Sequence, residues 1–176
     1  MQYSGTVLSL LALTLLALGV RVIGIDYGIP QQFIGDEFVQ VAIALTMLDE
    51  RALTPNFPDI FYHQPLSAYL STFGIAVFLG FHMLSGRFES FATLRDYYAI
   101  HAAELIIVPR FLSALLGALT VPLLYLVGRE LFGRRAGRIA AYFGAFEFLL
   151  VYVNHSGRVW GYMPFFSIPL NPDFAS

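Results

Sequence analysis

Long apolar runs separated by short charged stretches dominate the hydrophobic pattern of this chain. Four runs stand out, and they cover residues 5–25, 65–84, 105–127 and 139–153. About 20 consecutive apolar residues are needed to cross the hydrocarbon core of a bilayer as a helix, and the first three runs reach that length. The pattern predicts an all-α, multi-pass transmembrane protein, with transmembrane helices over 5–25, 105–127 and 139–153.

The first run has a competing interpretation as a secretory signal peptide. Such a peptide begins with basic residues and ends at a cleavage site of small residues. The first four residues include no arginine or lysine, and no such site follows residue 25. We therefore favour an uncleaved helix that stays in the membrane.

The segment between the first two runs, residues 26–64, is acidic and contains a candidate short helix. It holds six acidic residues and one arginine. Within it, residues 36–50 lack glycine and proline, as a helix requires. The apolar residues on one side of this helix are Phe38, Val41, Leu45 and Leu48. Because the helix is too short to span a bilayer, we expect it to lie along the membrane surface.

The charge of each loop predicts the side of the membrane that it occupies. Cytoplasmic loops are enriched in basic residues. Residues 128–138 hold four arginines and one acid, a net charge of +3, whereas residues 26–64 carry −5. We therefore expect 128–138 to be cytoplasmic and 26–64 to be external.

This orientation creates a parity problem for the run at 65–84. If that run crossed the bilayer, the acidic loop and the arginine-rich loop would lie on the same side. The favoured solution is a re-entrant or juxtamembrane hairpin, broken at Gly74 or Gly80, so that residues 26–104 form one external loop. An ordinary span with inverted topology is the alternative.

Composition narrows the possible function classes. Hydrophobic residues make up 57% and charged residues 12%, against about 45–50% and about 25% in soluble domains, which excludes an ordinary soluble domain. The chain contains neither cysteine nor lysine, which excludes thiolate catalysis, cysteine–zinc sites and lysine Schiff bases. A net charge of −2 gives no reason to expect nucleic acid as a partner.

The carboxylate pair Asp36-Glu37 is the strongest chemical signal. A carboxylate near a membrane surface acts as a general base on a hydroxyl or as a ligand for a divalent cation. The structural interpretation is that Asp36 caps the helix at 36–50 while Glu37 favours its positive end. The two interpretations are compatible, because a capped helix end holds a catalytic acid rigidly. No cofactor is required by the sequence, and a divalent cation held by this pair is left open.

Other polar residues lie at the ends of apolar runs. His63 and Gln64 either form a polar turn or hydrogen-bond a phosphate or a sugar. Arg110 is either an interfacial anchor or a ligand for a lipid phosphate, for which its planar guanidinium is suited. His155 and Arg158 present the same choice.

Three segments, in this order, resemble the N-terminal part of GT-C membrane glycosyltransferases, the superfamily of protein O-mannosyltransferases and aminoarabinose transferases. They are Gly35-Asp36-Glu37, YHQPLSAYL at 62–70, and RFLSALLGALTVPLLYLVGRELFGRRAGRIAA at 110–141. The last is the most specific, because the family places an Arg-x-x-Ser-Ala-x-x-Gly helix before a Gly-Arg-Arg turn. The resemblance extends from the first helix to about Phe166.

The resemblance implies many transmembrane helices, with juxtamembrane helices in a large first external loop. It implies sugar transfer, with inversion, from a polyprenyl- or dolichyl-phosphate donor to a hydroxyl of a protein, glycan or lipid acceptor. The active face would be external, in the plasma membrane if the source is prokaryotic.

The resemblance also assigns roles to individual residues. Asp36 matches the family's catalytic acidic position, with Glu37 beside it. Gln64 matches a position near the lipid phosphate, and Arg110 matches the arginine that opens the helix after the loop. Arg158 resembles the arginine of an Ala-Arg-x-Asp segment, although no acid follows it here.

Family members run to several hundred residues, so we expect residues 1–176 to be one membrane-embedded module, a fragment that is inactive alone. A transporter or channel subunit and a non-catalytic membrane scaffold are the alternative functions. Transporters place ionisable residues at the bilayer midplane. The candidate here is Glu147, for which a helix–helix hydrogen bond is the favoured interpretation.

Overall fold

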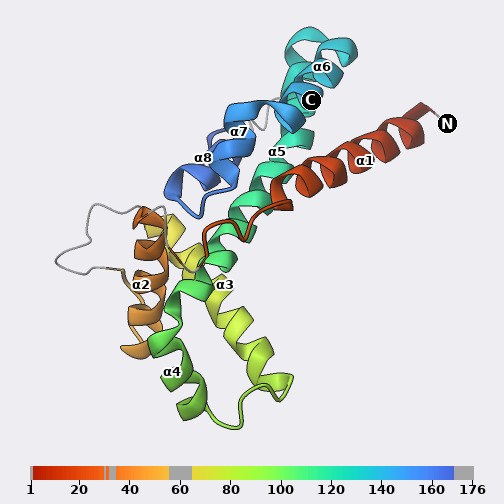
Figure 1. The fold of residues 1–176 in the computed structure, drawn as a ribbon. Coiled ribbons are helices and arrows are strands. Elements are labelled where there is room, and N and C mark those ends of the chain that lie inside the picture. The colour runs from red at the N-terminus through yellow and green to blue at the C-terminus, as the bar shows by residue number, and fades with distance from the viewer. Residues whose placement is uncertain (1, 30, 32–34, 56–64, 169–176) are drawn as a thin grey trace. The chain divides into compact units, whose positions relative to one another are not determined.

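The fold is given by a computed structural model that describes residues 2–29, 31, 35–55 and 65–168. Every regular element among these residues is a helix (Figure 1), which confirms the all-α prediction. In chain order the helices are α1 (Gln2–Val22), α2 (Gly35–Asp49), α3 (Pro65–Leu84), α4 (Phe91–Ile100), the 3-10 helix η1 (Ala102–Ile106), α5 (Ile107–Phe132), α6 (Arg134–Phe146), α7 (Phe148–Asn154) and α8 (Val159–Ser167).

In the part of the chain that the structure describes, three stretches of helix are long and apolar enough to cross a membrane. They are α1, α3 and the continuous stretch formed by η1 and α5. Helices α6 and α7 together make a fourth candidate, bent by 49° where they meet. Since hydrocarbon offers no partner to backbone polar groups, an apolar segment is expected to cross it as a helix. The helix lengths are consistent with an integral membrane protein.

The helices divide into two compact units, which we describe separately. Unit 1 contains α1, the part of α5 from Ser113 onward, α6, α7 and most of α8. Unit 2 contains α2, α3, α4, η1, the first residues of α5 and the short segment Gly157–Val159.

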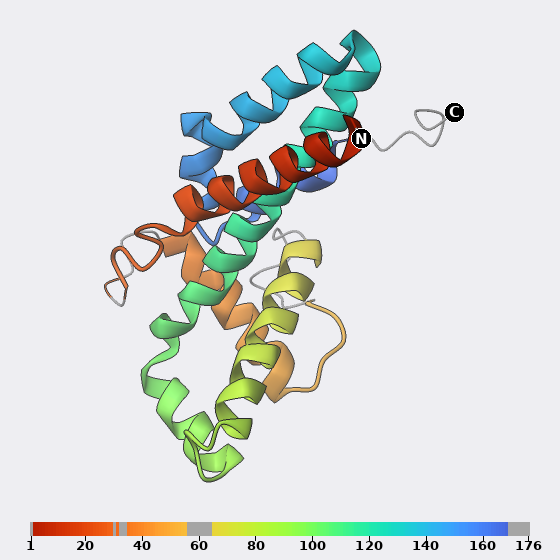
Figure 2. The same cartoon turned by 90° about the vertical axis from the view of Figure 1, so that its right-hand side faces the viewer.

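In unit 1, α5 and α6 form a hairpin, and α1 runs beside α6 in the same direction (Figure 2). The core between these helices consists largely of small residues: Ala17, Ala118, Val121, Tyr125, Ala141 and Ala145. Small side chains let helix backbones approach closely. Gly137 shows this, because a Cβ atom there would lie 2.6 Å from the carbonyl oxygen of Tyr125.

Two boundaries in unit 1 differ from the sequence prediction. Residues 128–138 are not a loop, because α5 and α6 continue through them and the chain reverses at Gly133 alone, with a φ of 87° that glycine tolerates. The predicted helix over 139–153 is interrupted at Glu147. The Glu147 carboxylate accepts a hydrogen bond of 2.7 Å from the backbone N–H of Leu150, so it caps α7 and does not bridge to another helix.

In unit 2, α2 packs against α3 and η1. This helix, Gly35–Asp49, confirms the helix predicted at 36–50, and it begins and ends one residue earlier. Its apolar side contributes to the larger core, which consists of Val41, Ala44, Ile75, Leu94, Tyr98, Leu105, Ile106 and Val108. A smaller cluster of Ile43, Met47 and Ala68 joins α2 to α3. Apolar contacts on two sides of α2 bury Val41, Ile43, Ala44 and Met47.

Helix α3 is a single continuous helix, so the predicted break at Gly74 or Gly80 is wrong. At Gly74 the reason is packing, since a Cβ atom there would lie 2.6 Å from Cδ1 of Leu112 and 3.0 Å from Cγ1 of Val108. Because residue 74 has no side chain, the start of α5 packs directly against α3. Gly74 is therefore a packing contact, and the helix does not bend there. The position of α3 with respect to the bilayer stays a prediction.

Candidate functional site

A buried ion pair joins Glu37 and Arg110 in unit 2. Glu37 lies in the first turn of α2, and Arg110 lies in the first turn of α5. The Arg110 guanidinium donates to both carboxylate oxygens, with Nε 3.0 Å from Oε1 and Nη2 2.6 Å from Oε2. Both side chains are buried, with 0% of Glu37 and 5% of Arg110 exposed. Such a two-point contact fixes distance and orientation together.

Backbone groups complete this ion pair. The N–H of Gly157 donates to Oε1 of Glu37 at 2.8 Å, and Nη1 of Arg110 donates to the carbonyl oxygen of Tyr27 at 2.7 Å. A Cβ atom at Gly157 would lie 3.2 Å from Pro109 and from the Arg110 nitrogen, so glycine allows the segment to approach this closely. Four separate parts of the chain are joined at one buried charge pair.

Asp36 has a different environment from its neighbour. Its side chain is 75% exposed, and Oδ2 lies 3.8 Å from Nη2 of Arg158, whose side chain is 38% exposed. Successive residues on a helix point about 100° apart, which accounts for one carboxylate facing inward and the next facing outward. Asp36 is therefore the member of the pair that can reach an external molecule.

This arrangement separates the predicted roles of the acidic pair. Glu37 has both oxygens engaged, so it holds the backbone of α2 in place, while Asp36 has the accessible carboxylate. The geometry favours the structural interpretation of Arg110, because three of its nitrogens already donate within the protein. Within the part of the chain that the structure describes, no three histidine or acidic side chains gather as a metal site would require.

Three further residues were predicted to take part in the site, and the structure describes one of them, His155. His63 and Gln64 lie outside the described residues. His155, in unit 1, has Nδ1 at 2.9 Å from the carbonyl oxygen of Val151 and Nε2 at 3.0 Å from that of Ile23. Both partners are carbonyl acceptors, so whichever ring nitrogen carries a proton can donate to the backbone. These contacts give His155 a role in joining α7 to the end of α1.

Sequence reasoning missed a second buried arginine, Arg21, at the end of α1. Its side chain is fully buried in unit 1 and donates to the carbonyl oxygens of Ala17, Gly144 and Ala145 at 2.8–3.1 Å. Its Nε also donates to Oδ1 of Asn154 at 3.0 Å. The sequence did indicate such a role, because Arg21 lies within an apolar run, where a charged side chain needs partners inside the protein.

The contacts of Arg21 explain why the break between α6 and α7 is stable. The carbonyl groups at the end of a helix lack partners within that helix. Arg21 satisfies two of them at the end of α6, where the negative end of the helix dipole also attracts a cation. Asn154 extends the network by donating from Nδ2 to the carbonyl oxygen of Gly161 at 2.8 Å.

The site in unit 2 thus combines an accessible carboxylate, an adjacent arginine and a rigid support. A carboxylate of this kind can accept a proton from a hydroxyl, and a guanidinium beside it can bind an anionic group. Comparison of the chain with protein-family models, with curated proteins and with solved structures produced no match.

Proposed function

We propose that this chain belongs to a membrane glycosyltransferase of the GT-C type, in which Asp36 is the general base. The observation that carries the proposal is the contrast between Asp36 and Glu37. One carboxylate is open to an incoming molecule, and the other is bonded three times to the protein. A base must be held in a fixed position to act on a bound hydroxyl, and Glu37 supplies that support from the adjacent residue.

The reaction is a substitution at the anomeric carbon of a polyprenyl- or dolichyl-phosphate sugar. The acceptor oxygen attacks that carbon from the face opposite the phosphate, and its proton passes to the Asp36 carboxylate. The bond between the anomeric carbon and the phosphate oxygen breaks, and its electron pair stays with the phosphate. The anomeric configuration is inverted. The Arg158 guanidinium, 3.8 Å from Asp36, is the nearby cation for the phosphate charge.

The membrane topology proposed here places Asp36 on the external face. Within unit 1, α5 runs opposite to α6, and α1 runs parallel to it. If all three cross the bilayer, the segment between α1 and η1 begins and ends on one side. If α3 crossed the bilayer, another helix of this segment would have to cross it in the opposite direction. Helix α2 has 15 residues, or about 22 Å, and is too short to cross the roughly 30 Å of hydrocarbon. We therefore assign α2, α3 and α4 to the external side, opposite the arginines at the end of α5 and the start of α6.

The test is sugar transfer from a defined polyprenyl-phosphate sugar by membranes that contain the complete protein. Asp36→Asn retains the shape of the side chain and removes its basicity. We expect transfer to fall by about 100-fold or more, the usual contribution of a general base. The amount of protein in the membrane and its unfolding temperature should not change, because Asp36 is exposed.

The matched control is Arg95→Gln, which removes a charge from another exposed ion pair, that with Asp49. This variant should keep normal transfer. The proposal fails if Asp36→Asn transfers sugar at the normal rate, or if the wild-type protein transfers none from any polyprenyl-phosphate sugar supplied.

A further inference from the structure

We propose that a groove between α1 and α6 binds an anionic phospholipid, a role separate from sugar transfer. The groove lies within unit 1 and has a volume of about 720 Å³. That volume falls within the range of about 300–1,000 Å³ seen for ligand sites. Its lining includes Gly5, Ser9 and Ala12 from α1 and Arg138 and Tyr142 from α6.

The groove exists because one side of α1 carries small residues. Gly5, Ser9 and Ala12 recur three or four positions apart, so they share one face of the helix. A Cβ atom at Gly5 would meet nothing within 4 Å, which shows that the space beside it is open. Leu13 and Leu16 supply further apolar lining. The space suits a flexible hydrocarbon chain.

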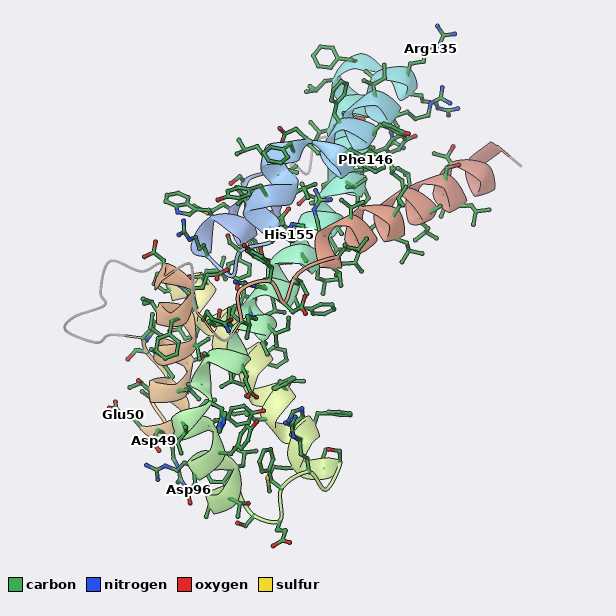
Figure 3. The ribbon with its side chains drawn as sticks, viewed as in Figure 1. Asp49, Glu50, Asp96, Arg135, Phe146 and His155 are labelled. Atoms are coloured by element: carbon green, nitrogen blue, oxygen red, sulfur yellow. The ribbon has the colours of Figure 1, made fainter. Side chains whose placement is uncertain are left out.

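The charge at this groove specifies the head group. Arg138 lines it, and Arg134 and Arg135 lie one turn earlier at the start of α6. Figure 3 shows Arg135 projecting from this end of α6. In the described part of the chain, neither Arg135 nor Arg138 takes part in an ion pair. Cations at a helix N-terminus are opposed by the helix dipole. A bound anion would offset that repulsion.

A phospholipid satisfies both features at once. Its phosphate would contact Arg138, and an acyl chain would lie along α1 in the groove. Basic pockets between transmembrane helices on the cytoplasmic side are known to bind anionic head groups. A zwitterionic lipid carries an ammonium group as well, and Arg135 and Arg138 repel it. Charge complementarity therefore selects an anionic lipid over a neutral one.

The experiment is a lipid titration of the purified full chain, followed by native mass spectrometry. Phosphatidylglycerol and phosphatidylcholine with identical acyl chains are compared, with glycerol phosphate as the head group alone. We expect phosphatidylglycerol to bind more tightly than phosphatidylcholine, and glycerol phosphate to compete poorly because it has no chain for the groove. Equal binding of the two lipids, or effective competition by glycerol phosphate, would overturn the proposal.

Two pairs of variants locate the site. Arg138→Gln should weaken phosphatidylglycerol binding about five-fold, the effect of removing one cation near a lipid phosphate. The control is Arg129→Gln, since Arg129 is basic but contacts the Tyr125 ring and does not line the groove. Ala12→Leu should weaken binding of both lipids by filling the groove, whereas Gly19→Leu, in open space on α1, should not.

Circular dichroism of each variant verifies that the helices are retained. Equal losses in Arg138→Gln and Arg129→Gln would show a diffuse basic surface and refute a specific site. Normal lipid binding by Ala12→Leu would refute the placement of the acyl chain. A second copy of the chain as the occupant, visible as a dimer that Ala12→Leu abolishes, would equally overturn the lipid assignment.

Discussion

Replacing Glu37 by glutamine removes a fully buried negative charge while keeping the size of the side chain. The change therefore isolates the ion pair with Arg110. In the native protein the Glu37 carboxylate accepts two hydrogen bonds from Arg110 and one from the N–H of Gly157. Glutamine has one acceptor oxygen, and its amide nitrogen would face a donor. The Arg110 guanidinium, with 5% of its side chain exposed, would be left as a buried cation without its counter-ion.

The expected cost follows from this burial. Removing one member of a buried ion pair destabilises a protein by about 3–5 kcal/mol, mostly because the remaining charge has lost its partner. For a chain of this length each kcal/mol lowers the unfolding temperature by about 2–4 °C, so Glu37→Gln should lower it by roughly 6–20 °C.

The assay is thermal unfolding of the detergent-solubilised protein, followed by far-UV circular dichroism. The matched control is Asp36→Asn, which makes the same acid-to-amide change one residue earlier. Because Asp36 is 75% exposed, its replacement should change the free energy of unfolding by less than about 0.5 kcal/mol. The double variant Glu37→Gln/Arg110→Met should unfold at a higher temperature than Glu37→Gln, since it also removes the unpaired cation.

Two results would contradict this reasoning. If Glu37→Gln and Asp36→Asn unfolded at the same temperature, the buried pair would not stabilise the fold. If the double variant unfolded at a lower temperature than Glu37→Gln, the unpaired Arg110 would not be the source of the cost.

Two further predictions concern helix packing and membrane topology. Gly137→Ala should destabilise the protein by about 1–3 kcal/mol, because the added methyl group would lie 2.6 Å from the Tyr125 carbonyl oxygen. Gly19→Ala, where the added methyl group would meet nothing within 4 Å, should be neutral or stabilising in the same thermal assay. The chain contains no cysteine, so a single introduced thiol reports its own position. Phe132→Cys should react with a membrane-impermeant thiol reagent only after permeabilisation, whereas Leu53→Cys, at a position 87% exposed, should react in intact cells. The opposite pattern would reverse the proposed topology.

Hydropathy along the chain was enough to predict the helical class and the principal apolar helices. The condition for spanning a bilayer is local, because it depends on about 20 neighbouring residues being apolar. The short helix at α2 was also predictable, since its periodic apolar residues lie within 15 positions. The acidic pair at its start was visible as a candidate site for the same reason.

Helix boundaries depended on contacts that hydropathy does not report. The sequence between Gly128 and Arg138 looks polar enough for a loop, yet the chain needs only Gly133 to reverse its direction. The break at Glu147 is equally hidden within an apolar run. Its stability comes from Arg21, which lies 124 positions from the Ala145 carbonyl that it bonds.

The separation of Asp36 from Glu37 was decided by tertiary structure alone. Both are acids in the first turn of one helix, and nothing in their local sequence ranks one above the other. Glu37 is buried because Arg110, 73 positions away, and Gly157, 120 positions away, bond to it. A buried charge is stable only with such partners, and the fold brings partners to one of the two carboxylates. The other carboxylate faces outward because the helix turns by about 100° per residue.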